Sequence, residues 1–189
     1  MKYMKCEIEE IDDLAGAYLF AREKEMTIEN LLEAHSIFAK RIISNKKEIG
    51  KLRKIKVGVG SEGKLIYLAI EPELVKEEIK KLFCDINILL KGNLSIEEVF
   101  YFASMIHLIF VNIHPFVDGN GRATRLLEKW FLSVKLGEMG WNIESEKYYF
   151  LHRNNYYQNL KLGANYYVIN YDLCLPFLLM LPESLRQKT

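Results

Sequence analysis

The segment from residues 96 to 113 constrains the fold more than any other, because the helix that it predicts is apolar on nearly every face. Ser95 and Glu98 have the spacing of a capping box, which opens such a helix. A helix without a polar face belongs in the middle of a bundle. Its apolar run, residues 99–111, is too short to span a bilayer and contains His107. We therefore expect a mainly α, compact helical bundle around this segment.

The rest of the chain predicts further helices and one β-hairpin. Apolar residues recur at helical spacing over about residues 8–25, 28–43, 72–88, 121–136, 146–163 and 173–181. Two β-rich runs, residues 55–59 and 64–68, flank a glycine turn and predict a hairpin over about residues 55–70. The 189 residues contain no repeat or linker, so we predict a single domain over residues 1–189.

Composition argues against several classes of protein. The 26 basic and 25 acidic residues nearly cancel, which leaves no global field to gather nucleic acid or anionic lipid. Cys6, Cys84 and Cys174 are odd in number and widely spaced, which argues against a disulfide framework or a zinc site. The N-terminus turns acidic before an apolar leader segment could develop. We expect a soluble, cytoplasmic protein that binds neither nucleic acid nor a membrane.

The first of two glycine motifs, residues 58–64, satisfies G-x-G-x-x-G and resembles a phosphate loop until Leu65 stands where Ser or Thr is needed. Phosphate-loop and dinucleotide sites need a helix directly after the glycines, because its amides and dipole hold the phosphate. Here a strand follows. The chain also lacks the H-R-D and D-F-G segments of a protein kinase. We interpret these glycines as turn residues of the hairpin, where they supply positive φ.

The second glycine motif lies in a short loop, residues 114–120, between the buried helix and the start of another. The backbone amides of Gly119, Asn120 and Gly121 are expected at a helix N-terminus, which favours an anion. Glycines on both sides of Asn120 let the backbone bend tightly and let a large anion come close. The pattern predicts a phosphate site.

The side chains around this loop divide the roles of phosphoryl chemistry between them. His114 can accept a proton near neutral pH and could activate a hydroxyl nucleophile. Asp118 is a hard oxygen ligand that could hold magnesium, which takes few carboxylates and completes its shell with water and phosphate. Arg122 and Arg125 lie three apart in the first helical turn and could neutralise further phosphates.

Each of these residues also has a plainer interpretation. Asp118 could be the turn residue of an Asp-Gly pair, and the two arginines could form surface pairs with Asp118 or Glu128. The other histidines, His35, His107 and His152, are expected to be structural. The functional interpretation rests on the conjunction of residue types in one loop.

Residues 114–125 resemble the signature of Fic (filamentation induced by cAMP) domains, His-Pro-Phe-x-Asp/Glu-Gly-Asn-Gly-Arg-x-x-Arg, with all signature positions filled. Eight fixed positions at about 5% usage each match by chance on the order of once in ten billion starts. The resemblance covers about residues 25–165. It implies a Fic-type helical bundle in which the hairpin over residues 55–70 is a flap upstream of the catalytic loop, residues 114–121.

The resemblance implies a protein adenylyltransferase that moves AMP from ATP to a Tyr, Thr or Ser hydroxyl of a target protein and releases pyrophosphate. His114 looks like the base, Asp118 like the ligand of Mg²⁺, residues 119–121 like the anion hole for the α-phosphate, and Arg122 and Arg125 like phosphate contacts. The motif also fits transfer of UMP, phosphocholine or phosphate. A third possibility is a non-catalytic nucleotide-binding module.

The resemblance also implies two partners. The target protein is expected to add a strand along the hairpin, with Tyr67 a candidate for contact. Many relatives carry an inhibitory segment, Ser/Thr-x-x-x-Glu-Gly/Asn, whose glutamate pairs with the second motif arginine, Arg125 here. The sequence has no match to that segment. We therefore expect restraint by a separate small, antitoxin-like protein, or no restraint.

Overall fold

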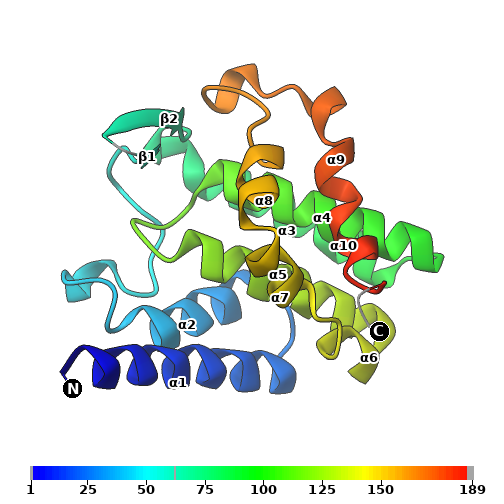
Figure 1. Ribbon diagram of the computed structural model, residues 1–189, viewed down its shortest axis with the longest axis horizontal. Coiled ribbons are helices and arrows are strands. Elements are labelled where there is room, and N and C mark those ends of the chain that lie inside the picture. Colours follow the sequence, from blue (N-terminus) through cyan, green and yellow to red (C-terminus); the bar gives the residue numbers. More distant parts are fainter. Residues whose placement is uncertain (1, 62, 187–189) are drawn as a thin grey trace.

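The computed structural model describes residues 2–61 and 63–186, which form a bundle of helices with one β-hairpin at its edge (Figure 1). The elements in chain order are α1 (Lys2–Glu23), α2 (Ile28–Ala39), η1 (Lys46–Glu48), β1 (Gly58–Ser61), β2 (Lys64–Leu68), α3 (Pro72–Lys91), α4 (Ile96–Ile113), α5 (Asn120–Leu136), α6 (Glu138–Trp141), α7 (Ser145–Leu151), α8 (Arg153–Asn159), η2 (Tyr166–Val168), η3 (Tyr171–Leu173), α9 (Leu175–Leu178) and α10 (Met180–Glu183). The mainly α fold with a hairpin is confirmed.

Helix α4 lies in the interior, as the sequence predicts, and its bounds agree with the prediction. The capping box is complete, since the Glu98 amide donates to the Ser95 hydroxyl (3.2 Å) and the Ser95 amide donates to the Glu98 carboxylate (2.8 Å). The helix packs against both α3 and α5. The polar interruptions in its apolar run, Ser104 and His107, are fully buried.

The length argument against a membrane span is wrong, because α4 extends beyond its apolar run. With 18 residues and a mean hydropathy of 1.5, it is long and apolar enough to cross a membrane by composition alone. Inside the protein, 56% of this segment is buried. That burial is typical of the core helix of a bundle.

Two hydrophobic cores lie on different faces of α4. The larger one lies among helices α1, α2, α3, α4 and α5. It contains the buried residues Phe38, Phe110, Phe116, Trp130 and Phe131. The smaller one packs α7 to α10 against Leu108 and includes Tyr149, Tyr156 and Phe177. The C-terminal third of the chain therefore forms a separate layer against α4 (Figure 1).

The hairpin is present, and the G-x-G-x-x-G glycines belong to it, as predicted. Among these glycines Gly63 alone has positive φ (76°); Gly58 and Gly60 lie in β1, so the prediction of positive φ is wrong for those two. A Cβ at Gly58 would lie 2.4 Å from Leu65 Cδ1, the end of an exposed side chain that can move aside. Glu62, in the predicted turn, lies outside the described residues.

The segment predicted as one helix over residues 146–163 is two short helices. Helix α7 ends at Leu151 and α8 begins at Arg153, with His152 between them at φ −107° and ψ 36°. The His152 ring stacks on Tyr148 (4.1 Å between ring centroids), and its Nδ1 donates to the Tyr148 carbonyl. The apolar periodicity continues across this break, so it gives no sign of the change in direction.

Candidate functional site

A cavity of about 490 Å³ opens where the hairpin, the end of α4, the start of α5 and α8 meet. A histidine and two arginines line it, together with apolar and aromatic residues. Its lining residues are Val59, Gly60, Ile66, Tyr67, Val111, Asn112, His114, Gly121, Arg125, Arg153, Tyr156, Tyr157, Leu160, Lys161 and Gly163. Three of the residues predicted for the site, His114, Gly121 and Arg125, line this one space.

His114 is set up as a neutral base. Its Nδ1 lies 3.2 Å from the carbonyl oxygen of Val111, which can only accept, so Nδ1 carries the proton and Nε2 has the free electron pair. Burial lowers the pKa of His114 below its ordinary value of 6.5. The imidazole is therefore uncharged at pH 7 and can take a proton at Nε2.

The backbone of His114 is left-handed, with φ 53° and ψ 59°, and no other non-glycine residue of segments 2–61 and 63–186 has positive φ. Such a conformation persists where the surroundings fix it, and it is often found at functional sites. Here the His114 amide donates to the Phe110 carbonyl (3.0 Å), which closes α4. The turn directs the chain away from α4 into the loop.

A buried arginine, Arg53, joins this turn to the base of the hairpin. Its Nε donates to the His114 carbonyl (2.8 Å), and its Nη2 donates to the carbonyls of Ile70 (2.6 Å) and Ile113 (3.3 Å). Nη1 donates to the Ile55 carbonyl (2.9 Å). Arg53 is 1% exposed, so one guanidinium satisfies four backbone carbonyls from segments far apart in the chain. Figure 1 shows the hairpin beside the loop between α4 and α5.

The loop itself is held by Asn120. The Phe116 amide donates to Asn120 Oδ1, and Asn120 Nδ2 donates to the Phe116 carbonyl, both at 2.9 Å. These two hydrogen bonds tie the side chain of Asn120 to the backbone of Phe116 across the loop. Gly119 adopts φ 81°, and a Cβ there would lie 2.9 Å from Phe38. The glycine before Asn120 is therefore required by both backbone conformation and space.

The start of α5 presents backbone amides to this end of the cavity. The first helical hydrogen bond runs from the Ala123 amide to the Gly119 carbonyl (3.0 Å), so the helix supplies no acceptor for the amides of Asn120, Gly121 and Arg122. The Gly119 amide differs from the prediction, because it donates to Asp118 Oδ1 (2.6 Å). The anion site indicated by this structure therefore begins at Asn120 rather than Gly119.

Asp118 is exposed beside the helix N-terminus. Among residues 2–61 and 63–186 there is no group of three or more His, Cys, Asp or Glu side chains that could hold a metal ion by itself. One carboxylate fits the needs of Mg²⁺, which takes one or two carboxylates together with phosphate oxygens and water. A magnesium ion here therefore requires a bound phosphate to complete its ligands.

The two arginines of the motif have different surroundings. Arg122 Nη2 pairs with Glu10 of α1 (2.9 Å). Arg125 lies between two cavities, since it lines both the one with His114 and a second of about 580 Å³ that is lined by α1, α5, α7 and α8. Within the described part of the chain, Arg125 forms no ion pair with a carboxylate. The surface pairs with Asp118 or Glu128 are likewise not formed.

His35 is structural, as predicted. His35 is fully buried; its Nδ1 accepts from the Gly50 amide (3.0 Å), so its Nε2 donates to the Asp118 carbonyl (3.1 Å). Its ring stacks on Phe116 (3.7 Å between ring centroids). Burial lowers the pKa of His35 to about 4, so a neutral ring supports the loop from below.

We expect the stability of the protein to fall between pH 6.5 and 4 because of His35. Above pH 6.5 the ring is neutral in both states, whereas below it the unfolded chain binds a proton that the folded protein does not bind until about pH 4. The free energy of unfolding should drop by about 3 kcal/mol over this window. Denaturant unfolding at several pH values should show a smaller pH dependence in His35→Asn than in the wild type; equal slopes would contradict the prediction.

Several residues of the site give no signal in the sequence. Arg53 is one cation in a lysine-rich loop, and Tyr156, Tyr157 and Leu160 read only as helix. Tyr67, considered as a contact for the target, is instead an anchor: it is 9% exposed, and its hydroxyl donates to the Asn112 carbonyl (2.7 Å). Only the folded chain brings these residues to the motif.

Comparison with known proteins adds three findings on sequence. The model of the Fic/DOC family matches residues 25–132. A protein adenylyltransferase fic-1 of Caenorhabditis elegans is 33% identical over 105 residues, which cover 54% of this chain and 18% of the relative. The corresponding protein of Caenorhabditis briggsae is 31% identical over the same shares. The matched part is thus less than a fifth of the length of these relatives.

Solved structures share the fold at low sequence identity. A Fic family protein from Desulfovibrio desulfuricans has a TM-score of 0.73 at 21% identity, covering 96% of this chain and 54% of its own. The BepC protein of Bartonella tribocorum, solved with bound AMPPNP, has a TM-score of 0.63 at 15% identity, covering 96% of this chain and 84% of its own. The arrangement of helices and hairpin is therefore shared by nearly the whole chain.

Proposed function

Because this chain belongs to the Fic/DOC family, we propose that it transfers AMP from ATP to the hydroxyl group of a Tyr, Thr or Ser side chain on a target protein. One observation carries the proposal. The neutral His114 lines the same cavity as Gly121, at the amide end of α5, so a base and an anion site face one space. A base beside a phosphate site is the arrangement that activation of a hydroxyl for attack on phosphorus requires.

The reaction uses these groups in order. Nε2 of His114 takes the proton of the target hydroxyl, and the oxygen attacks the α-phosphorus. A new oxygen–phosphorus bond forms while the bond to the bridging oxygen breaks, and pyrophosphate leaves with the electron pair. The amides of residues 120–122 hold the oxygens of the α-phosphate, and Arg122 and Arg125 neutralise the departing pyrophosphate. Asp118 would hold Mg²⁺, which when bound supplies further neutralisation of phosphate charge.

The rim of the cavity suits the nucleoside end of such a donor. Leu160 and Ile66 give it apolar walls, and Tyr157 adds an aromatic face on which a base can stack. The volume of about 490 Å³ lies in the range of pockets that hold molecules of nucleotide size. Phosphate and base can therefore be held at opposite ends of one cavity.

The hairpin offers the means of target docking. Its β1 strand pairs only with β2 among the described strands, whereas the Leu68 amide of β2 already donates to the Ala164 carbonyl (3.0 Å). A target segment added along β1 would place its hydroxyl near the cavity, since Val59 and Gly60 line it. A target protein is thus the partner we propose for this edge.

The experiment that tests the proposal uses two labelled donors. The protein is incubated with Mg²⁺, a cell lysate and ATP labelled at either the α- or the γ-phosphate. We expect α-label to enter protein and γ-label to appear in pyrophosphate. Entry of γ-label into protein would show kinase-like transfer instead. Tight nucleotide binding without transfer of either label would show a binding module, and labelled UTP in place of ATP tests the donor.

We propose that a separate small protein restrains this activity, or that it is not restrained. In the described part of the chain, Arg125 forms no ion pair with a carboxylate. Glu10 is the carboxylate that contacts a motif arginine, and it contacts the first, Arg122. Both side chains are about 30% exposed or less, 29% and 27%, so the pair is partly screened by water. A small protein that presents a carboxylate to Arg125 would meet its guanidinium where it lines the cavity.

Releasing Arg122 from Glu10 should strengthen nucleotide binding modestly. We expect Glu10→Gln to raise the affinity for Mg·ATP by about two- to fivefold, since a partly exposed ion pair contributes up to about 1 kcal/mol. Titration calorimetry measures the change, with Glu9→Gln as control, because Glu9 pairs with Arg41 instead (3.0 Å). An unchanged or weaker affinity in Glu10→Gln would contradict the expectation.

A further inference from the structure

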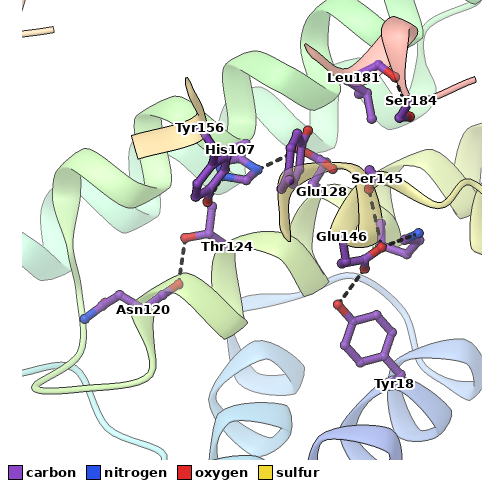
Figure 2. Close-up of polar contacts among 12 residues, drawn as sticks. Tyr18, His107, Asn120, Thr124, Glu128, Ser145, Glu146, Tyr156, Leu181 and Ser184 are labelled. Carbon is purple, nitrogen blue, oxygen red and sulfur yellow. Dashed lines mark hydrogen bonds and ion pairs between the residues drawn. The ribbon is translucent and has the colours of Figure 1, made fainter. Parts of the chain in front are cut away.

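A chain of buried polar side chains leads from the core to Arg125. Glu128 Oε2 lies 2.6 Å from His107 Nδ1, and His107 Nε2 lies 2.9 Å from the Tyr156 hydroxyl. Glu128 and His107 are fully buried and Tyr156 is 4% exposed. Figure 2 shows the three side chains together between α4, α5 and α8. Buried polar groups are normally satisfied by hydrogen bonds, yet Glu128 Oε1 is buried without a partner among the described residues, so this cluster calls for an explanation.

The hydrogen bonds of this chain have a definite direction. The Glu128 carboxylate can only accept, and it also accepts from the Tyr149 hydroxyl (2.9 Å), so His107 Nδ1 carries a proton. When this is the single proton on the ring, Nε2 accepts and the Tyr156 hydroxyl donates to it. The proton of Tyr156 is thereby committed to His107, which leaves the lone pairs of its oxygen for a donor on the other side.

The donor available there is the guanidinium of Arg125, which lines the same two cavities as Tyr156 and interacts with its hydroxyl. Arg125 and Tyr156 line the cavity with His114 and the second cavity as well, so the chain ends at the site of the proposed chemistry. An arginine side chain has several rotatable bonds, and fixing it before the ligand arrives avoids an entropic cost on binding.

We propose that Tyr156 is a positioning residue, which with His107 and Glu128 behind it holds the guanidinium of Arg125 in place to receive the phosphates beyond the α-phosphate. The inference rests on the proposed function, since it gives Arg125 a phosphate to bind. It gives a role to His107 and Glu128, which take no part in the proposed reaction itself.

Binding of inorganic pyrophosphate with Mg²⁺ tests the proposal without requiring transfer. Tyr156→Phe removes only the hydroxyl, and we expect about tenfold weaker binding by calorimetry, the usual scale for a lost hydrogen bond to a charged group. The control is Tyr148→Phe, because Tyr148 lines neither cavity and its hydroxyl donates to Glu183 (2.7 Å). It should change the affinity by less than about twofold. Wild-type affinity in Tyr156→Phe would overturn the proposal.

Two further variants show whether Tyr156 acts through Arg125. In an Arg125→Ala background, Tyr156→Phe should have no additional effect on pyrophosphate affinity, because the group that it positions is gone. Glu128→Gln should weaken binding severalfold although Tyr156 is intact. An amide in place of the carboxylate can donate to Nδ1 of His107, and Nε2 would then donate to the Tyr156 oxygen in competition with Arg125. Additive effects in the double variant would overturn the proposal.

A nuclear magnetic resonance measurement separates this inference from the proposed function. The Nε–H signal of Arg125, assigned by its loss in Arg125→Lys, should exchange slowly with water in the wild type and rapidly in Tyr156→Phe. A signal that behaves alike in both proteins refutes the positioning role. If the signal changes as expected but the wild type binds no pyrophosphate, the positioning role stands and the proposed function fails.

Discussion

The His114→Ala variant is expected to transfer AMP about a hundred- to ten-thousandfold more slowly than the wild type, with nearly unchanged affinity for Mg·ATP. The variant loses the Nε2 base, whereas the amides at the start of α5 and the two motif arginines remain. Transfer of α-label under saturating ATP measures the rate, and calorimetry measures the affinity. A rate within a few fold of the wild type would remove His114 from the base role.

The control and the pH profile sharpen this test. His152→Ala removes a histidine that lines neither cavity and should leave the rate of transfer nearly unchanged. Because burial lowers the pKa of His114, the free base persists below its ordinary pKa of 6.5. The rate should therefore fall on the acid side only below pH 6.5, as His114 gains a proton. An acid limb above pH 6.5 would contradict the assignment.

Loss of Arg53 is expected to have the largest effect on stability. Arg53→Met leaves four backbone carbonyls, those of Ile55, Ile70, Ile113 and His114, without their donor in a buried place. We expect the free energy of unfolding to drop by about 3–5 kcal/mol, because the buried carbonyls of Ile70 and Ile113 cost about 1–3 kcal/mol each when unsatisfied, whereas water can reach the partly buried pair. Denaturant unfolding followed by circular dichroism measures the change.

A neighbouring cation provides the matched control for Arg53. Lys54→Met removes an exposed charge from the same loop and should change stability by no more than about 0.5 kcal/mol. Arg53→Lys should be intermediate, since one ammonium group has donors but lacks the planar reach of a guanidinium. If Arg53→Met is as stable as Lys54→Met, the clamp between hairpin and loop does not contribute to the fold.

The parts of the fold that the sequence predicts well are those set by local chemistry. The capping box at Ser95 and Glu98 marks the start of α4, and the apolar run that follows it ends before the glycine-rich loop, so the bounds of the helix follow from short-range patterns. The elements after the two glycine motifs are also predicted from nearby residues: a strand comes after the first motif and a helix after the second.

The parts that could not be predicted depend on contacts between distant segments. Nothing near Arg53 indicates that it reaches carbonyls 60 and 61 residues away. The break at His152 depends on how α7 and α8 pack against α4, and the periodicity of the sequence is the same with or without it. The burial of Tyr67 and the chain behind Arg125 likewise exist only in the folded protein.

The cavity also has a modular origin along the chain. Its phosphate end comes from residues 114–125, inside the segment matched by the family model, while Arg153, Tyr157, Leu160 and Gly163 of its rim come from beyond residue 132. The two ends are nevertheless joined through Tyr156, which interacts with Arg125, so a change within residues 153–163 reaches the phosphate end as well as the rim. An exchange of this segment between relatives that aims at the nucleoside alone would have to keep Tyr156.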